Sequence, residues 1–252
     1  MRLYDLLKQA TLRSLPDPLL QPLKKLHYAR VLEGPGTNEL EASVLPHLVR
    51  LGDVVLDLGA NFGGYTKLLS GLVGERGTVI SVEPVPRTCE ILRYNIERHR
   101  LANVQVVAAA VSDQEGTVEM EVPQYPSGGE NYYRSAIVDV NQDSGRARFT
   151  VAATTVDTIC PGPVHFIKCD VEGHEEAVIR GARRTIETHR PAWLVEVSNR
   201  DVLRSVRDLG YQIFVFDGVS LRWQSESDRP INSFFLTEAH LATLQKGGVQ
   251  LA

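Results

Sequence analysis

The residues best suited to chemistry form a short loop, Asp57–Gly64, with the sequence DLGANFGG. The loop follows an apolar run over 54–60 and precedes YTKLLSGLV over 65–73, whose apolar spacing predicts a helix. Glycines at 59 and 63 let the backbone approach a ligand closely, and the start of the next helix carries partial positive charge. The loop therefore predicts a site for a nucleotide-type cofactor at the end of a buried strand.

Two cofactor classes fit such a loop. A dinucleotide fingerprint has the pattern G-x-G-x-x-G, whereas the residue two before Gly59 is Asp57. An anionic side chain there repels a pyrophosphate and suits the ammonium group of a methionine moiety, directly or through water. Glu83 ends the next predicted strand, where a carboxylate can accept bonds from both ribose hydroxyls of either cofactor. We therefore predict S-adenosylmethionine (SAM), with an NAD-dependent oxidoreductase and a non-catalytic SAM-binding protein as alternatives. Further expected cofactor contacts are Asn61, Phe62 and Pro84.

A third strand is predicted over 104–111, and it ends in small apolar residues followed by Ser112 and Asp113. Small groups followed by polar ones suit an adenine ring and its exocyclic amine. The same residues also suit a simple turn before Gly116. Ser112 is therefore a candidate adenine contact, with the turn as the alternative.

A second group of ionisable residues, KCDVEGHE over 168–175, lies at the end of the fourth predicted parallel strand. A hydroxyl that accepts a methyl group must lose its proton around the time of transfer, and a positioned histidine or carboxylate can take it. The candidates are Asp170, Glu172 and His174, of which His174 has the unperturbed pKa nearest neutrality. His174 and Glu175 equally suit the first turn of a helix without any catalytic role.

The same strand ends suggest an alternative metal site. Asp170 ends the fourth parallel strand, and Glu196 and Asn199 stand at the end of the fifth. Oxygen ligands of this kind suit Mg²⁺, which can acidify a substrate hydroxyl. Because the sequence contains no close-spaced ligand cluster, we do not expect a metal.

A polar stretch over 123–145 interrupts the strand pattern before the fourth parallel strand. Aromatic residues on a loop beside a crevice either form a substrate lid or pack the loop down. The residues concerned are Tyr125, Tyr132, Tyr133 and Arg134.

Strand and helix patterns alternate along most of the chain, which predicts an α/β, Rossmann-like, doubly wound fold with a mostly parallel sheet and helices on both faces. Two period-two segments before the fourth parallel strand predict an antiparallel insertion. Residues 1–50 are predicted to form helices interrupted by Pro16, Pro18, Pro22 and a glycine turn, as an extension or cap on a domain over 51–252. The predicted strands are 54–60, 78–84, 104–111, 165–171 and 192–198, with a last pair at 211–217 and 232–238; the helices are 65–73, 89–101, 175–189 and 201–210; and the insertion strands are 116–122 and 147–156.

Composition limits the possible partners. The 252 residues carry a net charge of −4, which argues against nucleic acid as a partner, and no stretch is apolar enough to span a membrane. Three cysteines without metal or disulfide spacing predict a reduced, cytoplasmic protein. The expected partner is a small molecule with a hydroxyl group, and the N-terminal helices either cap its pocket or form a homodimer interface.

Several motifs together resemble the FkbM family of SAM-dependent methyltransferases. They are GDVVLDLGANFGGYT, SVEP, AAVSDQEGTV, TTVDTI and FIKCDVEGHEEAVIRGA, in this order between about residues 38 and 200. The resemblance implies a seven-stranded Rossmann-like fold and O-methylation of sugars or natural products. Residues 1–37 and 123–148 match nothing in the family pattern and are expected to shape the substrate pocket. By position, the resemblance implies cofactor contacts at Asp57, Gly59, Asn61 and Glu83, the strand-four motif at Asp170, Glu172 and Gly173, and the preceding motif at Thr155, Val156 and Asp157; His174 stands where the family varies.

Overall fold

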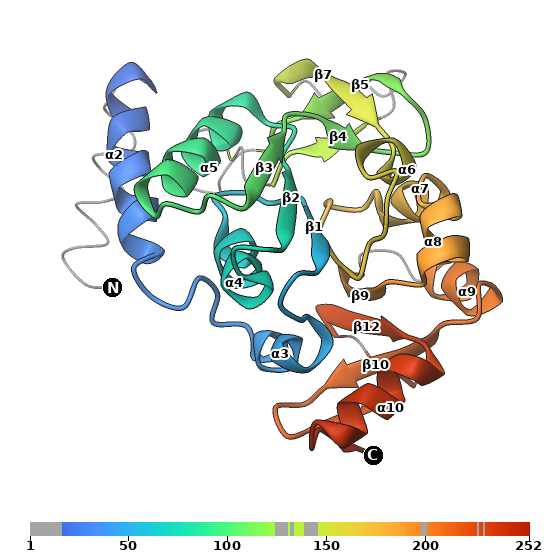
Figure 1. Ribbon diagram of the computed structural model, residues 1–252. Helices are drawn as coiled ribbons and strands as arrows, with labels where there is room; N and C mark the ends of the chain where they lie inside the picture. Colours follow the sequence, from blue (N-terminus) through green and yellow to red (C-terminus); the bar gives the residue numbers. More distant parts are fainter. Residues whose placement is uncertain are drawn as a thin grey trace.

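The computed structural model describes residues 17–123, 131, 134–138, 146–197, 201–225, 227–228 and 230–252. Within these residues the chain forms a nine-stranded sheet with helices on both sides and a separate four-stranded sheet (Figure 1). In spatial order the large sheet runs β13 (Gln250–Leu251), β11 (Ser220–Trp223), β10 (Gln212–Phe216), β12 (Asn232–Leu236), β9 (Ala192–Glu196), β8 (Phe166–Cys169), β1 (Val54–Leu58), β2 (Thr78–Val82) and β3 (Val104–Val107).

The five strands from β9 to β3 are parallel, and β12 inserts antiparallel between β9 and β10. The predicted α/β Rossmann-like fold with a mostly parallel sheet is therefore confirmed. The seven expected strands are all present, but the count is wrong because β11 and β13 extend the sheet beyond β10. The hairpin to β11 forms because the Asp217 carboxylate accepts the N–H groups of Val219 and Ser220 in the turn, at 2.9 and 2.8 Å.

The central strands are buried on both faces, as their continuous apolar sequences predict. In β1, Leu56 and Leu58 belong to one core cluster and Val55 to the other. The first cluster lies under α7 (Glu175–Arg180), α8 (Arg183–His189) and α9 (Asp201–Asp208). The second lies under α3 (Leu45–Leu48), α4 (Gly64–Val73) and α10 (Glu238–Lys246), on the opposite side of the sheet (Figure 1).

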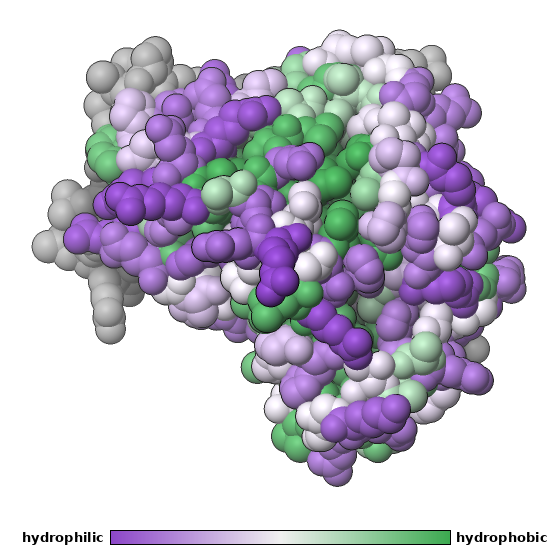
Figure 2. Space-filling view, in the orientation of Figure 1, coloured by the Kyte–Doolittle hydropathy of each residue, from purple (hydrophilic) through white to green (hydrophobic). Residues whose placement is uncertain are grey.

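The predicted third strand, 104–111, is divided between two sheets. β3 ends at Val107, and β4 (Ala110–Val111) pairs with β7 (Arg148–Thr154) in the four-stranded sheet. The apolar sequence is continuous, so it does not show that the strand changes partners. β3 is an edge strand with partly buried side chains, and apolar side chains gather between α5 (Pro86–Arg98) and the second sheet on this face of the molecule (Figure 2).

The antiparallel insertion is confirmed. β5 (Gly116–Glu121) pairs with β7 over its full length, from Gly116 opposite Ala153 to Glu121 opposite Arg148. β6 (Ala136–Ile137) adds to the other edge of β5. The insertion is followed by a short helix, α6 (Val156–Ile159).

The helix predicted over 175–189 is two helices, α7 and α8. They separate at Gly181, where a Cβ atom would lie 2.1 Å from the carbonyl oxygen of Ser112. This close approach to the backbone after β4 is a tertiary contact that the local apolar spacing does not contain.

The N-terminal region packs against helices that flank the sheet. α2 (Asp17–Val31) continues through Pro22, contrary to the prediction that the prolines interrupt the helices; Pro18 lies in the first turn, where the missing N–H costs nothing. α2 lies beside α5, with an ion pair of 3.3 Å between Lys25 and Glu90 (Figure 1). A 3-10 turn, η1 (Leu40–Ser43), leads into α3. Among the described helices, none has the length and apolar character needed to cross a membrane.

Candidate functional site

The loop after β1 has the backbone geometry that its glycines predict. Gly59, Asn61 and Gly63 all have positive φ angles, of 78°, 52° and 100°. A Cβ atom on Gly59 would lie 1.7 Å from the carbonyl oxygen of Asp170, so no other residue fits at this position. The loop therefore passes directly against the end of β8, and the two motifs singled out in the sequence meet here.

Glu83, directly after β2, fixes this loop from the other side. Its carboxylate accepts the backbone N–H of Asn61 through Oε2 and that of Val85 through Oε1, both at 2.9 Å. Glu83 is 5% exposed, and burial raises its pKa to about 7 although the two N–H groups oppose this shift. Each carboxylate oxygen keeps a second lone pair for a ligand hydroxyl.

A pocket opens beyond the carboxyl ends of β1, β2 and β8, where ligands of open α/β sheets bind. The cofactor loop and the Glu83 turn form one side. The ends of β3 and β8 and the second sheet, with Met120, Ser135 and Ile137, enclose the rest. The predicted contacts that line the pocket are Gly59, Asn61, Glu83, Pro84, Asp170 and Glu172.

Asp57 and Phe62 lie behind this lining. Asp57 is 2% exposed and accepts a hydrogen bond of 2.6 Å from the Thr66 hydroxyl on α4; burial raises its pKa to about 6. Phe62 stacks on Tyr28 of α2, with ring centroids 4.6 Å apart. Neither is among the described residues that line the pocket, so their direct contact with the cofactor stays a prediction, while their observed contacts anchor the loop.

Ser112 and His174 contact each other outside the lining of the pocket. The Ser112 hydroxyl lies 2.9 Å from Nε2 of His174, the residue preceding α7. Burial lowers the pKa of His174. The catalytic role predicted for His174 and the adenine contact predicted for Ser112 remain predictions.

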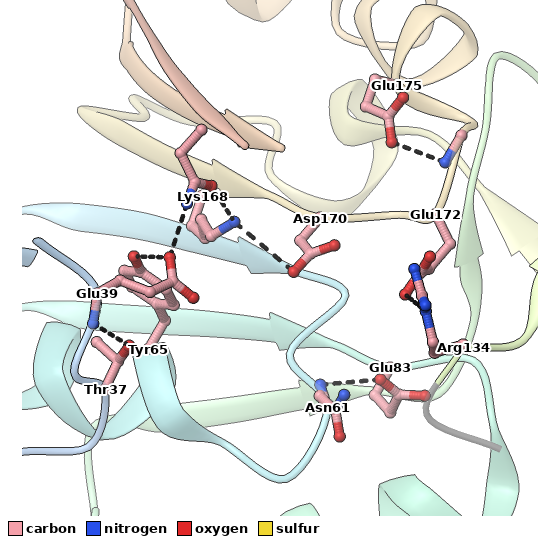
Figure 3. A network of polar contacts seen from close by, with 12 residues as sticks. Thr37, Glu39, Asn61, Tyr65, Glu83, Arg134, Lys168, Asp170, Glu172 and Glu175 are labelled. Atoms are coloured by element: carbon pink, nitrogen blue, oxygen red, sulfur yellow. Dashed lines mark hydrogen bonds and ion pairs between the residues drawn. The ribbon is translucent and has the colours of Figure 1, made fainter. Parts of the chain in front are cut away.

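The carboxylates at the ends of β8 and β9 are brought together. Residues 169 and 195 are paired in the register of these strands, so the next residues, Asp170 and Glu196, stand side by side. Burial, and then the negative charge of Asp170, raise the pKa of Glu196 to about 7. Glu172 has a positive φ of 50°; burial and Asp170 raise its pKa, and its carboxylate lies 3.8 Å from Arg134 (Figure 3).

The predicted metal ligands are only partly described. Asp170 and Glu196 converge as expected, but Asn199 lies outside the described residues. Within the described part of the chain, no group of three or more histidine, cysteine, aspartate or glutamate residues is arranged to hold a metal ion. Of the predicted lid residues, Tyr125, Tyr132 and Tyr133 also lie outside the described residues, and the exposed Arg134 side chain lies 3.8 Å from the Glu172 carboxylate.

The motif TTVDTI, residues 154–159, has a structural role. The Asp157 carboxylate accepts the backbone N–H groups of Arg184 and Thr185 at 2.9 and 2.8 Å, and so caps the start of α8. Thr155 in turn accepts the N–H of Thr158 and begins α6. The motif TTVDTI therefore holds the helices behind β8 rather than the cofactor.

Sequence reasoning missed a buried lysine beside the pocket residue Asp170. Lys168, in β8, is 2% exposed, and its Nζ lies 3.8 Å from Asp170 and 3.4 Å from Oδ1 of Asn232. The sequence did contain a signal for it, a charged residue inside an otherwise apolar strand. A lysine in such a strand is almost never buried unless it is paired, so its position indicates a buried partner. Its partners, from β12 and from α4, could not be found in the sequence.

A mostly parallel α/β sheet with a glycine loop, an acidic residue after β2 and a pocket at the carboxyl ends of the strands defines a Rossmann-like fold with a site for a nucleotide-type cofactor. The model of the methyltransferase FkbM domain matches residues 57–213, well over half of the chain. The chain belongs to this family, and its cofactor is SAM.

Known proteins agree with this assignment at different levels. The crystal structure of methyltransferase FkbM from Methylobacillus flagellatus has a TM-score of 0.51 and 18% identity, covering 73% of this chain and 44% of that one, and so supports the fold alone. The protein-L-isoaspartate O-methyltransferase of Methanothrix thermoacetophila is 37% identical over 71 residues, 25% of this chain and 34% of the relative. An Archaeoglobus fulgidus protein of the same description is 30% identical over 80 residues, 32% and 36% of the two chains. The chain spans about a third of the length of these curated relatives.

The residues at the pocket fit SAM. Oδ1 of Asn61 is buried and has no hydrogen-bond partner among the described residues, at a position that lines the pocket. A buried polar atom of this kind is costly unless a ligand or water satisfies it. Glu83 would hold the ribose hydroxyls, and Asn61 and the loop backbone would hold the rest of the cofactor. When bound, SAM supplies an electrophilic methyl group on a sulfonium centre.

Proposed function

We propose that this protein transfers the methyl group of SAM to a hydroxyl of a small molecule, such as a sugar or a natural-product intermediate. The observation that carries the proposal is the position of Asp170. It lines the pocket, touches the cofactor loop through its carbonyl, and presents a half-buried carboxyl group beside that of Glu196.

Methyl transfer from a sulfonium centre is intrinsically favourable, so the protein mainly has to position the two reactants. A hydroxyl acceptor also loses its proton, so the site needs a base to receive it. A carboxylate at the mouth of the pocket supplies that acceptor. Asp170 and Glu172 line the pocket, and each has a cation at 3.8 Å, Lys168 beside Asp170 and Arg134 beside Glu172. Asp170 is the candidate base because its backbone is packed directly against the cofactor loop at Gly59. The curated relatives, which are named O-methyltransferases, match over only part of this chain.

The first test is binding. Isothermal titration with SAM and with S-adenosylhomocysteine is expected to show one site per chain, and Glu83→Ala is expected to weaken both ligands. The second test is turnover of SAM with panels of monosaccharides, phenols, amines and carboxylic acids, followed through release of S-adenosylhomocysteine. Methylated products should come from the hydroxyl acceptors.

Asp170→Asn separates the two tests. It is nearly isosteric and leaves Glu83 and Asn61 in place, so S-adenosylhomocysteine binding should stay close to wild type while turnover falls by roughly 100-fold or more, the usual worth of a general base. Products methylated only on nitrogen or carbon would contradict O-methylation. Full turnover by Asp170→Asn would remove the role assigned to Asp170.

A further inference from the structure

Lys168 is a buried cation that the proposed function does not use. It occupies the middle of β8, opposite Asp57 on β1 and Leu194 on β9. With 2% of its surface exposed, its ammonium group loses most of its hydration, so it needs charged or polar partners. One partner is the Asp170 carboxylate, 3.8 Å away. Burial raises the pKa of Asp57, and the positive charge of Lys168 opposes this shift.

The other contacts of Lys168 lead away from the cofactor. Its Nζ lies 3.4 Å from Oδ1 of Asn232 and 5.1 Å from the ring centre of Tyr65. Both of these residues donate hydrogen bonds to the same oxygen of Glu39, from Nδ2 of Asn232 at 2.8 Å and from the Tyr65 hydroxyl at 2.7 Å. Figure 3 shows Glu39, Tyr65 and Lys168 to the left of Asp170, Glu172 to its right, and Asn61 and Glu83 below it.

Glu39 belongs to a segment that crosses the start of α4, which we call the N-terminal strap, residues 32–39. Lys67 on α4 donates to the carbonyl oxygens of Leu32 and Gly34. At Gly36 the strap touches the helix backbone, since a Cβ atom there would lie 2.5 Å from the carbonyl oxygen of Gly64. The strap therefore reaches the sheet edge beside Asp170, and its last residue is held by Tyr65 and Asn232.

We propose that Lys168 is a positioning residue: it fixes the Asp170 carboxylate in the pocket and, through Asn232 and Tyr65, holds Glu39 and the N-terminal strap against the same edge, so that the strap forms the acceptor end of the crevice. The name acceptor end rests on the proposed function. The positioning itself rests on contacts between Lys168, Asp170, Asn232, Tyr65 and Glu39.

A purely structural ion pair makes a different prediction. Removing one partner of a buried ion pair leaves the other charge uncompensated and lowers stability, so Lys168→Met should melt at a lower temperature than wild type and is compared with it where both are folded. A purely structural ion pair predicts this loss of stability alone. If Lys168 positions its neighbours, the folded variant should also lose two things: the protection of the amides directly after the strap against hydrogen exchange, and methyl transfer. Lys246→Met, on the exposed last turn of α10, is the matched control.

The experiment measures three quantities on the full chain. S-adenosylhomocysteine affinity by titration calorimetry should stay within about threefold of wild type in Lys168→Met, because Asn61 and Glu83 are untouched. Hydrogen exchange of the Ala42 and Val44 amides, which lie in η1 and at its C-cap directly after the strap and donate to the carbonyl oxygens of Glu39 and Glu41, should become roughly tenfold faster. The kcat for a hydroxyl acceptor found in the turnover panel should fall at least tenfold, with Lys246→Met unchanged in all three.

Asn232→Ala provides a second route if Lys168→Met does not fold. It removes the Asn232 link between Lys168 and Glu39 and leaves the Tyr65 link, while every charge stays in place, so it should also speed exchange at Ala42 and Val44. Wild-type exchange at these amides in a folded variant would overturn the proposal. Faster exchange together with a protein that methylates no hydroxyl would retain Lys168 as the residue that holds the strap and refute only the acceptor assignment.

Discussion

The Ser112 hydroxyl and Nε2 of His174 lie 2.9 Å apart and join the end of β4 to the start of α7. The same two segments are held together by Arg180, which donates to Asp113 at 3.0 Å, and by Gly181 packed on the Ser112 backbone. His174 is thus one of several contacts that lock α7 to the second sheet, which favours a structural role.

We expect His174→Gln to change turnover by less than about threefold, because glutamine can keep the hydrogen bond to Ser112, whereas a general base contributes roughly 100-fold or more. The measurement is S-adenosylhomocysteine release at saturating SAM, beside Ser112→Ala as the variant that breaks the same contact from the other side. Loss of turnover in His174→Gln with wild-type S-adenosylhomocysteine affinity would restore His174 as the base.

Glu83 should make cofactor binding depend on pH. Burial raises its pKa from the ordinary glutamate value of 4.5 to about 7, so in the ligand-free protein the group is largely protonated at pH 6 and largely ionised at pH 8. Ribose hydroxyls donate best to the ionised form, so binding near pH 6 should release a proton, and affinity should rise between pH 6 and 8.

Glu83→Gln removes this titration. We expect S-adenosylhomocysteine affinity to fall by on the order of tenfold to 100-fold, the worth of a hydrogen bond to a charged group, and its rise between pH 6 and 8 to disappear. Calorimetry in two buffers of different ionisation enthalpy measures the released proton directly. Asp57, whose pKa burial raises to about 6, is present in both wild type and Glu83→Gln. An unchanged pH dependence of affinity in Glu83→Gln would therefore assign the released proton to Asp57.

The sequence predicts what depends on local pattern. The apolar runs correctly predict the central strands, and period-two alternation correctly predicts the pairing of β5 with β7. The glycines of the cofactor loop and the acidic residue after β2 were sufficient to predict Gly59, Asn61 and Glu83 at one pocket. Each of these signals lies within a few residues along the chain.

What the sequence does not predict depends on contacts between distant segments. The hydrogen bond from Asn232 to Glu39 joins residues 193 positions apart, and nothing near either residue indicates it. The strand over 104–111 is divided because Ala110 pairs with β7, which lies some 40 residues later in the chain. Lys168 was visible as an anomaly in an apolar strand, but its function depends on Tyr65 and Asn232, which come from other elements.

Gly59 should tolerate no side chain. Alanine would have to adopt a positive φ and place its Cβ atom 1.7 Å from the Asp170 carbonyl oxygen, so we expect Gly59→Ala to lose roughly 3 kcal/mol or more of unfolding free energy, or to move the loop and lose cofactor binding. Gly71→Ala, in α4 with open space around its Cβ position, should instead gain up to about 1 kcal/mol. Urea unfolding of both variants tests this, and wild-type stability with wild-type S-adenosylhomocysteine affinity in Gly59→Ala would refute it.

His240 should make the C-terminal helix sensitive to acid. Nδ1 of His240 accepts the backbone N–H of Thr237 at 3.0 Å in the capping box of α10. Burial, with a smaller contribution from Arg190, lowers the pKa of His240 from 6.5 to about 4. Between these two values the unfolded chain binds more protons than the folded one, so the contribution of His240 is complete above pH 6.5 and is lost as the pH falls toward 4.

His240→Gln keeps a hydrogen-bond acceptor at the third helical position, where glutamine completes a capping box, but it cannot titrate. We expect similar stability to wild type at pH 7, and at pH 4 a loss smaller than that of wild type by up to about 3 kcal/mol, since one pKa unit corresponds to about 1.4 kcal/mol. Urea unfolding at pH 4, 5 and 7 measures the difference, with His27→Gln on α2 as the control for an exposed histidine. The carboxylates titrate equally in all three proteins, so their contribution cancels in the difference in unfolding free energy between any two of them. Equal losses of stability at pH 4 in wild type and His240→Gln would contradict the prediction, because they would show that the folded protein protonates His240 without weakening the cap.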